Sequence, residues 1–254
     1  MRGRHSQQRA AASSRLMPDA PRAMGQGSCP GPTGRGGPAR PGPGHVAGLA
    51  YGSISRMTEL TDVPGAFGYG DSILVGDRVR LRGVRDDDLP TLAKWEMDPG
   101  RMATLSNWVA PSSEAAAKER IGKWSANEKD DLGFAIETLD DPPLLVGFVG
   151  IWGARPKDRC AEFGIALGRE YIGRGYGSDA TRVMVDYGFR EMGLHRIQLG
   201  VVSFNLAGIR AYEKAGFVEE GRHRESVLHD GRWYDDVLMS ILDHEWAARR
   251  APGR

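Results

Sequence analysis

The fold is decided by residues 160–193, which read CAEFGIALGREYIGRGYGSDATRVMVDYGFREMG. Apart from Glu162, positions 160–167 hold small and apolar residues, and this composition predicts a strand. Residues 178–192 carry an apolar stripe at helical spacing and predict a helix that Ser178 or Asp179 caps. A strand, a short loop and a helix in this order form a unit that can hold a ligand at the start of the helix.

Three glycines stand at alternate positions of the loop between these elements. Because glycine has no Cβ, successive backbone N–H groups can approach one anion closely, and the following helix adds the positive end of its dipole. The loop is therefore a candidate phosphate site, although an ordinary glycine-rich turn is the alternative. Its residues are Gly173, Arg174, Gly175, Tyr176, Gly177 and Ser178.

Two well-known phosphate loops do not fit this stretch. A P-loop nucleotidase needs Lys-Ser or Lys-Thr after the glycines, and a Rossmann unit needs an acidic residue about 20 positions on to hold a ribose. Neither pattern is present in the required place. Another phosphate-bearing ligand is implied.

The segments that follow are LHRIQLGVV at 194–202 and NLAGIRAYEKAGFVEEG at 205–221. Strand, glycine loop, helix, strand, Asn-led short helix and a last hairpin at Asp230-Gly231 come in an order that resembles the GCN5-related N-acetyltransferase (GNAT) superfamily. Within it, the chain resembles the RimJ/RimL type of ribosomal-protein N-terminal acetyltransferases. The resemblance covers roughly residues 77–246. One departure is Ile172, where many members carry Gln or Arg, and it puts one side-chain contact in doubt.

The resemblance implies an α/β fold of the α+β kind, with a mixed sheet. The expected sheet is central, twisted and mostly antiparallel, it splays at the acetyl-CoA site, and helices cover both of its faces. The patterns predict further strands at 79–82, 133–138 and 144–152, a hairpin of 226–228 with 233–241, and helices that begin near 86–88 and 112–113.

In the family, the pantetheine arm of acetyl-CoA lies in the opening of the sheet. The resemblance therefore implies that backbone groups of Ile165, Ala166 and Leu167 hold this arm and polarise the thioester carbonyl. Asn205 is expected to hydrogen-bond the same arm, and the alternative is that it only caps the helix that it begins.

Two residues are candidates for proton transfer. An amine must be neutral to attack, and the reference pKa of a lysine-like amine is about 10.4, against about 7.7 to 8.0 for an α-amine. The resemblance assigns the general base to Glu162, directly or through water, and the alternative is an exposed charge. It assigns the general acid for the CoA thiolate to Tyr212, and the alternative is an aromatic residue that packs on the cofactor.

Other conspicuous side chains are given structural roles. Asp235 and Asp236 have the chemistry to bind a cationic substrate, but their hairpin setting favours a salt bridge or an exposed charge. His195 is expected at a strand edge without a catalytic role. Four aromatic residues fall in segments that line the acceptor cleft in relatives, and packing is their default role: Trp108, Trp152, Trp233 and Tyr234.

The chain has 254 residues and a formal charge of +1, which gives no general case for nucleic-acid binding. Residues 1–56 differ from the rest, because they carry eight arginines against Asp19 as the only acid and are rich in glycine and proline. A disordered tail is expected there, with translation from Met57 as an alternative and RNA as its one conceivable nucleic-acid partner. Residues 57–254 are expected to form the acetyltransferase domain.

The two cysteines, Cys29 and Cys160, give no metal-binding spacing, and no metal is expected. No apolar run reaches membrane-spanning length, so a soluble, cytoplasmic enzyme without a membrane partner is predicted. Apolar residues on the terminal hairpin, 218–241, favour a homodimer.

These observations predict an acetyl-CoA-dependent N-acetyltransferase that uses a ternary complex. The expected acceptor is a primary amine, first of all a protein N-terminal amine. The alternatives are a small-molecule amine (a polyamine, an amino acid or an antibiotic) and a non-catalytic acyl-CoA sensor. The presence of both Glu162 and Tyr212 favours catalysis.

Overall fold

The computed structural model describes residues 60–105, 108–128 and 131–250. The predicted tail, residues 1–56, lies outside the described residues. The helices are α1 (Val63–Ile73), α2 (Leu89–Glu96), α3 (Pro99–Leu105), α4 (Glu114–Trp124), α5 (Tyr176–Arg190), α6 (Leu206–Ala215) and α7 (Asp243–Arg250), with 3-10 turns η1 (Asp86–Asp88) and η2 (Arg169–Tyr171). The strands are β1 (Val79–Arg82), β2 (Leu132–Thr138), β3 (Leu145–Arg155), β4 (Cys160–Leu167), β5 (Arg196–Val202), β6 (Val218–His229) and β7 (Arg232–Leu242).

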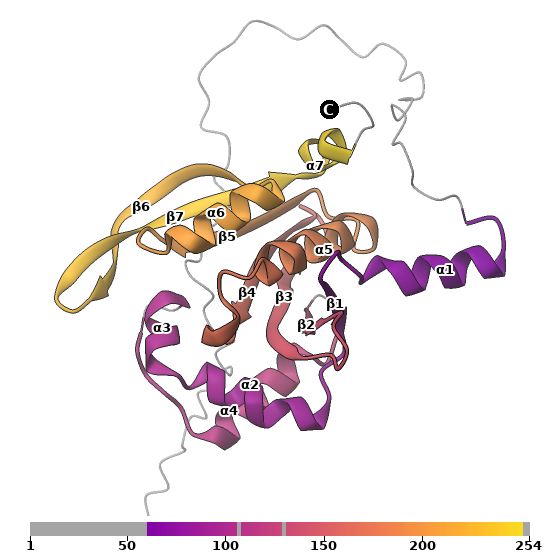
Figure 1. Cartoon of the computed structure of the whole chain (residues 1–254). Coiled ribbons are helices and arrows are strands. Elements are labelled where there is room, and N and C mark those ends of the chain that lie inside the picture. Colours follow the sequence, from indigo (N-terminus) through magenta and orange to yellow (C-terminus); the bar gives the residue numbers. More distant parts are fainter. Residues whose placement is uncertain (1–59, 106–107, 129–130, 251–254) are drawn as a thin grey trace, which may run out of the picture.

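The strands form one seven-stranded sheet in the order β1-β2-β3-β4-β5-β7-β6 (Figure 1). Every neighbouring pair is antiparallel except β4 with β5, which run parallel. The hairpin of β6 with β7 turns at Asp230 and Gly231, which both have positive φ, as a tight two-residue turn requires. The predicted mixed, mostly antiparallel sheet is confirmed.

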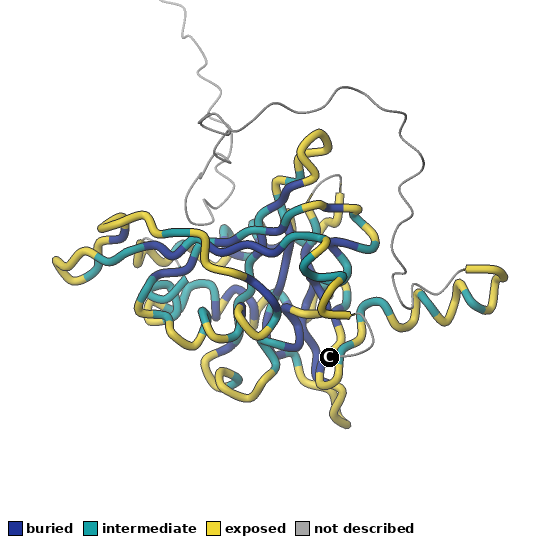
Figure 2. Tube along the Cα trace, turned by 90° about the horizontal axis from the view of Figure 1, so that it is seen from above, coloured by how far each residue is buried: buried dark blue, intermediate teal, exposed yellow. Residues whose placement is uncertain are grey.

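Helices α5 and α6 cover one face of the sheet, where the main core lies. Ile151, Phe163, Met184 and Ile197 belong to this core and are almost fully buried. Met184 comes from α5, and the three strand residues alternate with residues of the other face, as the two-residue period of a strand requires. Figure 2 shows the buried strands at the centre and the mostly exposed α1 extending away from them.

Helices α2 and α4 pack on the opposite face, beside β3. Trp95 and Ile121 are buried between them, and Phe148 of β3 packs against this smaller cluster. Ser113 caps α4, because its side chain accepts a hydrogen bond from the Ala116 N–H at 3.3 Å. The predicted helices that begin near 86–88 and 112–113 are therefore both present.

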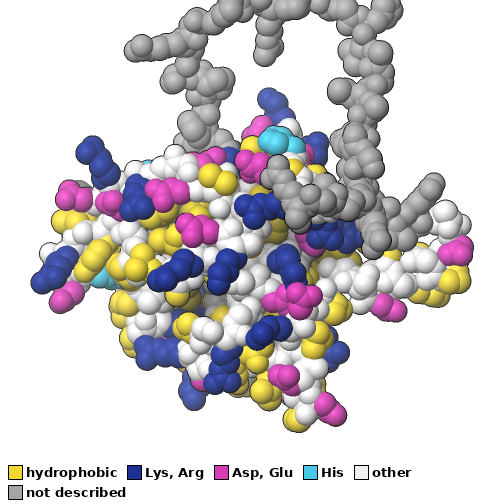
Figure 3. All heavy atoms as spheres, turned by 45° about the horizontal axis from the view of Figure 1, so that its top comes forward, with side chains coloured by type: hydrophobic (Ala, Val, Ile, Leu, Met, Phe, Trp, Pro, Cys, Tyr) yellow, Lys and Arg dark blue, Asp and Glu magenta, His cyan; other side chains and the backbone are white. Residues whose placement is uncertain are grey.

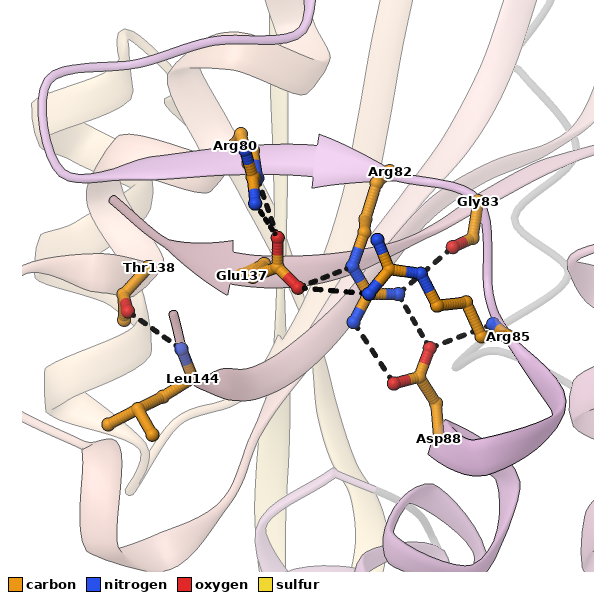
Figure 4. A network of polar contacts seen from close by, with 8 residues as sticks. All are labelled: Arg80, Arg82, Gly83, Arg85, Asp88, Glu137, Thr138 and Leu144. Carbon is orange, nitrogen blue, oxygen red and sulfur yellow. Dashed lines mark hydrogen bonds and ion pairs between the residues drawn. The ribbon is translucent and has the colours of Figure 1, made fainter. Parts of the chain in front are cut away.

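A network of charged side chains joins β1, β2 and the start of α2 (Figure 4). Glu137 accepts hydrogen bonds from Arg80 Nε at 2.6 Å and Arg82 Nε at 2.7 Å, and Arg82 also binds Asp88. Burial acts to raise the pKa of Glu137, but the two arginines overcome it and the pKa is lowered. The buried carboxylate is fully paired and ties the first strand to the sheet.

The start of α5 differs from the prediction. The helix begins at Tyr176, and its N-cap residue is Gly175 in the left-handed conformation, with no side-chain cap. Ser178 and Asp179 are therefore not the N-cap. The Asp179 carboxylate instead accepts backbone N–H groups of 77–79, at 2.8 to 3.2 Å, and so holds the chain before β1 against the first turn of α5.

Three helices were not predicted: α1, α3 and α7. Asp62 caps α1 by accepting the Gly65 N–H at 2.7 Å, with a proline in the first turn. None of these helices buries a residue fully, so the apolar stripe that marks a packed helix is missing from their sequences. Within the described residues, none of the helices has the length and apolar character needed to cross a membrane.

Candidate active site

The sheet opens between its two parallel strands. β4 pairs with β5 at only three positions, which end at Glu162 opposite Gln198. Beyond that point β4 continues to pair with β3 as far as Leu167, and β5 continues to pair with β7 as far as Val202. Backbone groups of β4 that point toward β5 therefore have no partner strand after Glu162. The predicted splay is present, and Ile165, Ala166 and Leu167 lie along it.

The glycine loop closes the far end of β4. Gly173 and Gly175 have φ of 80° and 87°, values that favour glycine strongly. The backbone then enters α5, whose first N–H groups have no partner within the helix. Arg174, Tyr176, Gly177 and Ser178 complete this turn, so the six predicted loop residues lie together at one helix N-terminus, as an anion site requires.

Arg78 supports the loop from outside. Its Nη1 donates to the Arg174 carbonyl oxygen at 2.9 Å, on a segment that Asp179 holds in place. A cavity of about 250 Å³ adjoins the loop. Its lining includes the basic side chains of Arg78, Arg182 and Lys214 and the acids Asp77 and Asp179, both of which pair with Arg182. Lys and Arg side chains are also spread across the face of the molecule shown in Figure 3. Because the two acids pair with Arg182, Arg78 and Lys214 are the basic side chains of this lining that favour an anionic ligand beside the loop.

Glu162 lies at the apex of the splay, on the face that α5 does not cover. Its Oε1 accepts a hydrogen bond from Gln198 Nε2. Burial raises the pKa of the Glu162 carboxyl; the Gln198 hydrogen bond and the charges of Arg196 and Arg155 oppose this shift. A carboxylate with a raised pKa is a better proton acceptor near neutral pH than an ordinary glutamate. The alternative reading of Glu162 as an exposed charge is wrong, because the residue is half-buried.

Tyr212 approaches the splay from the other face, on α6. It is 8 % exposed, and its ring lies 6.0 Å from that of Phe163 and 5.9 Å from that of Phe217, centroid to centroid. Burial raises the pKa of the phenol to about 12, so the hydroxyl stays protonated at neutral pH and can donate a proton. Glu162 and Phe163 are sequence neighbours, so base and acid candidates meet the same point of β4 from opposite sides.

Asn205 is the N-cap residue of α6, as predicted. Its Oδ1 accepts the Gly208 N–H at 3.0 Å, and its Nδ2 donates to the Thr104 carbonyl oxygen of α3 at 3.4 Å. The capping role is therefore confirmed. Its contact with the pantetheine arm stays a prediction.

Sequence reasoning missed Arg101, a half-buried residue of α3. Its Nε donates to the Leu167 carbonyl oxygen at 3.0 Å, at the end of the splay, and burial lowers the pKa of its guanidinium to about 10. The position in a short, unpredicted helix left no signal for this role. Arg101 thus fixes one of the backbone groups predicted to face the ligand.

Asp236 contradicts the expectation of a salt bridge or an exposed charge. It is 4 % exposed, and among the described residues its Oδ1 has no hydrogen-bond partner. Asp235 agrees better with a structural role, because its Oδ1 accepts the Glu225 N–H at 3.0 Å. His195 also agrees with a structural role, because its Nδ1 lies 3.1 Å from Asp243 Oδ2.

The family described as the acetyltransferase (GNAT) domain matches residues 78–218, more than half of the chain. The chain belongs to the GNAT acetyltransferase family. It is accordingly an acetyl-CoA-dependent N-acyltransferase, and the matched residues contain the splay, the glycine loop and both proton-transfer candidates.

Individual N-acetyltransferases are also similar to this chain in sequence. The chain is 33% identical over 178 residues to the spermidine N(1)-acetyltransferase of Escherichia coli (strain K12), which covers 69% of this chain and 92% of that protein. It is 33% identical over 169 residues to the uncharacterized N-acetyltransferase YnaD of Bacillus subtilis (strain 168), over 66% of this chain and 96% of that protein.

The fold is also similar to a solved GNAT structure. The spermidine N-acetyltransferase from Vibrio cholerae in complex with CoA and spermine superimposes with a TM-score of 0.60 and 26% identity, over 66% of this chain and 97% of that one. Within the described residues of this chain, no group of three or more His, Cys, Asp or Glu side chains is placed to hold a metal ion.

Proposed function

We propose that this enzyme transfers the acetyl group of acetyl-CoA to a primary amine, with Glu162 as general base and Tyr212 as general acid. The observation that carries the proposal is the position of the two side chains on opposite faces at one point of the splay. The glycine loop, 173–178, would bind the pyrophosphate through its N–H groups. The free backbone edge of 165–167 would hold the pantetheine arm.

The proton balance follows from these positions. Glu162 takes one proton from the acceptor ammonium, and the neutral nitrogen forms a bond to the acetyl carbon. The carbon–sulfur bond breaks, and the sulfur leaves with its electron pair and takes the proton of the Tyr212 hydroxyl. The nitrogen then loses its second proton through solvent to the tyrosinate, and Glu162 releases its proton to solvent. The products are the acetylated amine and CoA thiol.

Two acceptor classes are supported by different findings. The resemblance to the ribosomal-protein acetyltransferases supports a protein N-terminal amine. The likeness to spermidine N-acetyltransferases supports a small polyamine. The half-buried Glu162 carboxylate at the acceptor face suits both, since each acceptor arrives as a cation.

The ligand site is tested by thermal shift with acetyl-CoA. Gly175→Glu places a side chain on a residue with φ of 87° and a negative charge beside the phosphate loop. Acetyl-CoA is expected to raise the melting temperature of the parent enzyme and not that of the variant. Gly122→Glu on α4 is the matched control, because its new side chain meets open space. Equal stabilisation of Gly175→Glu and parent would refute the loop assignment.

The reaction is tested by release of CoA thiol from acetyl-CoA. The acceptors are a peptide with a free α-amine, the same peptide with that amine blocked, and spermidine. Thiol release with either unblocked amine supports the proposal. Stabilisation by acetyl-CoA without thiol release from any acceptor would instead indicate a non-catalytic sensor.

A further inference from the structure

Asp236 is a buried carboxylate without the usual compensation. It lies on β7 opposite Val202 of β5, it is 4 % exposed, and its Oδ1 has no hydrogen-bond partner among the described residues. Buried carboxylates are normally paired with a cation or hydrogen-bonded on both oxygens, because desolvation of the charge is costly. A group left in this state is suited to a cation that arrives from outside.

The strand register places Asp236 on the same sheet face as Glu162. Gln198 lies opposite Glu162 on β4, and Gln198, Gly200 and Val202 alternate along β5 so that all three share this face. The two acids are also close enough for the charge of Asp236 to raise the pKa of Glu162. Both carboxylates therefore lie on one face of the sheet.

Gly200 forms the floor between them. A Cβ at this position would stand 2.8 Å from Asp236 Oδ2 and 3.1 Å from Oδ1, so the carboxylate lies directly against the glycine. Glu162, Gln198 and Gly200 are each only half-buried, which leaves this part of the face open. Along this face, Gln198 and Gly200 thus lie between an acid at each end, Glu162 and Asp236.

The basic residues nearby are engaged elsewhere or lie at the rim. Arg196, on the same face of β5, is paired with Glu220 and donates to Ser240 Oγ at 3.1 Å. His223 lies opposite Asp236 on β6 and is exposed; its charge acts to lower the pKa of Asp236, but burial outweighs it and the pKa is raised. The described residues thus supply no close ion pair for this carboxylate.

We propose that Asp236 binds an ammonium group of the acceptor, and that the acceptor carries a second positive charge besides the amine that reacts beside Glu162. This proposal rests on the proposed function and names its acceptor class: a slender diamine or polyamine. Its methylene chain would lie along the Gly200 floor. An acceptor whose only positive charge is the reacting amine lacks a partner for Asp236.

The test compares two acceptors that differ by one ammonium group, 1-aminobutane and 1,4-diaminobutane, with spermidine as a longer acceptor. With the better of 1,4-diaminobutane and spermidine, the kcat/KM of the parent enzyme is expected to be at least about tenfold higher than with 1-aminobutane. This factor is roughly the effect of one charge-assisted hydrogen bond. Asp236→Asn should abolish this preference by raising KM for the polyamine, with kcat little changed.

Asp235→Asn is the matched control, because it makes the same chemical change one residue away, on the opposite face, and should keep the preference. Asp236→Ser is a second variant, which removes the carboxylate with less volume and should act as Asp236→Asn does. A preference that survives in both Asp236 variants, or a parent enzyme without any preference, overturns the proposal.

A binding measurement separates this inference from the proposed function. Spermidine is titrated calorimetrically into the complexes of CoA with the parent enzyme and with Asp236→Asn. Loss of binding in the variant alone supports the ammonium site even where no acetyl transfer is seen, which would refute only the proposed function. Equal binding by both refutes the ammonium site even where acetyl transfer is fast.

Discussion

Glu137 on β2 and Asp236 on β7 are 3 % and 4 % exposed, yet the side chains around the two carboxylates differ. Glu137 is surrounded by Arg80 and Arg82, and its pKa is lowered (Figure 4). Asp236 has no such partner, and burial raises its pKa. Glu162, between them on β4, also has a raised pKa.

Equal burial therefore does not define the role of a carboxylate in this sheet. A charge that the chain itself neutralises holds strands together, whereas a charge that the chain leaves unneutralised costs stability and is a candidate for ligand contact. The paired acid lies at the β1 edge, away from the splay, and the unpaired acids lie where the sheet opens. The comparison predicts that the two groups respond differently to removal of charge.

The largest effect is expected for Glu162→Gln. Removal of a positioned base typically lowers the rate by about 10² to 10⁴, so kcat at neutral pH should fall by this factor while acetyl-CoA still raises the melting temperature. Glu119→Gln, an exposed change on α4, is the control and should leave kcat unchanged. If Glu162→Gln kept the full kcat, Glu162 would have a structural role like that of Glu137.

Tyr212→Phe removes only the hydroxyl and is expected to lower kcat by a factor of about 10² or more. The ring contacts with Phe163 and Phe217 remain, so acetyl-CoA affinity should change little. Tyr187→Phe on α5 makes the same change away from the splay and serves as the control. Steady-state kinetics that show no loss of kcat would assign Tyr212 to packing alone.

Glu137→Gln should affect stability instead of catalysis. The change removes the buried carboxylate that Arg80 and Arg82 share, and leaves Arg82 with Asp88 alone. Breaking a buried ion pair costs about 3 kcal/mol or more. For a domain of this size, the melting temperature should fall by on the order of 10 °C, while kcat per folded molecule is retained. Glu219→Gln removes an exposed pair with Arg222, and the melting temperature should change little. A stable but inactive Glu137→Gln would break the comparison.

The smallest effect, and of opposite sign, is expected for Asp236→Asn. A carboxyl whose pKa is raised in the folded state destabilises the fold at any pH where it is ionised in both the folded and the unfolded protein. This loss of stability disappears as the pH falls through the folded-state pKa toward the ordinary pKa of aspartate. The variant should therefore melt about 1 to 4 °C higher than the parent at pH 7, and the difference should vanish in acid. Thermal melts across pH measure this; a lower melting temperature at pH 7 would mean that Asp236 has a stabilising partner.

The sequence was sufficient for the sheet and for the glycine loop because their signals are local. Glycines at alternate positions, a helix at regular spacing and Asp230-Gly231 each specify backbone geometry directly. The capping role of Asn205 followed from the same kind of signal. The family resemblance supplied the splay, which no single segment reveals.

Other features depend on contacts between distant segments and were out of reach. Asp179 is a residue type that often caps helices, but its carboxylate accepts hydrogen bonds from the N–H groups of 77–79, about one hundred residues away in the chain. Arg101 and Asp236 are defined by what lies beside them in space, and a hairpin sequence does not say which cations reach an acid. The RimJ/RimL branch and the homodimer remain predictions.

The pH dependence of kcat/KM for amine acetylation tests the central claim most directly. If Glu162 is the base, the parent profile falls in acid with an apparent pKa above the ordinary glutamate range, and this limb is absent from Glu162→Gln, which regains rate as alkaline pH deprotonates the amine. A variant profile that runs parallel to that of the parent at every pH would contradict the account, because Glu162 would then orient the substrate without accepting its proton.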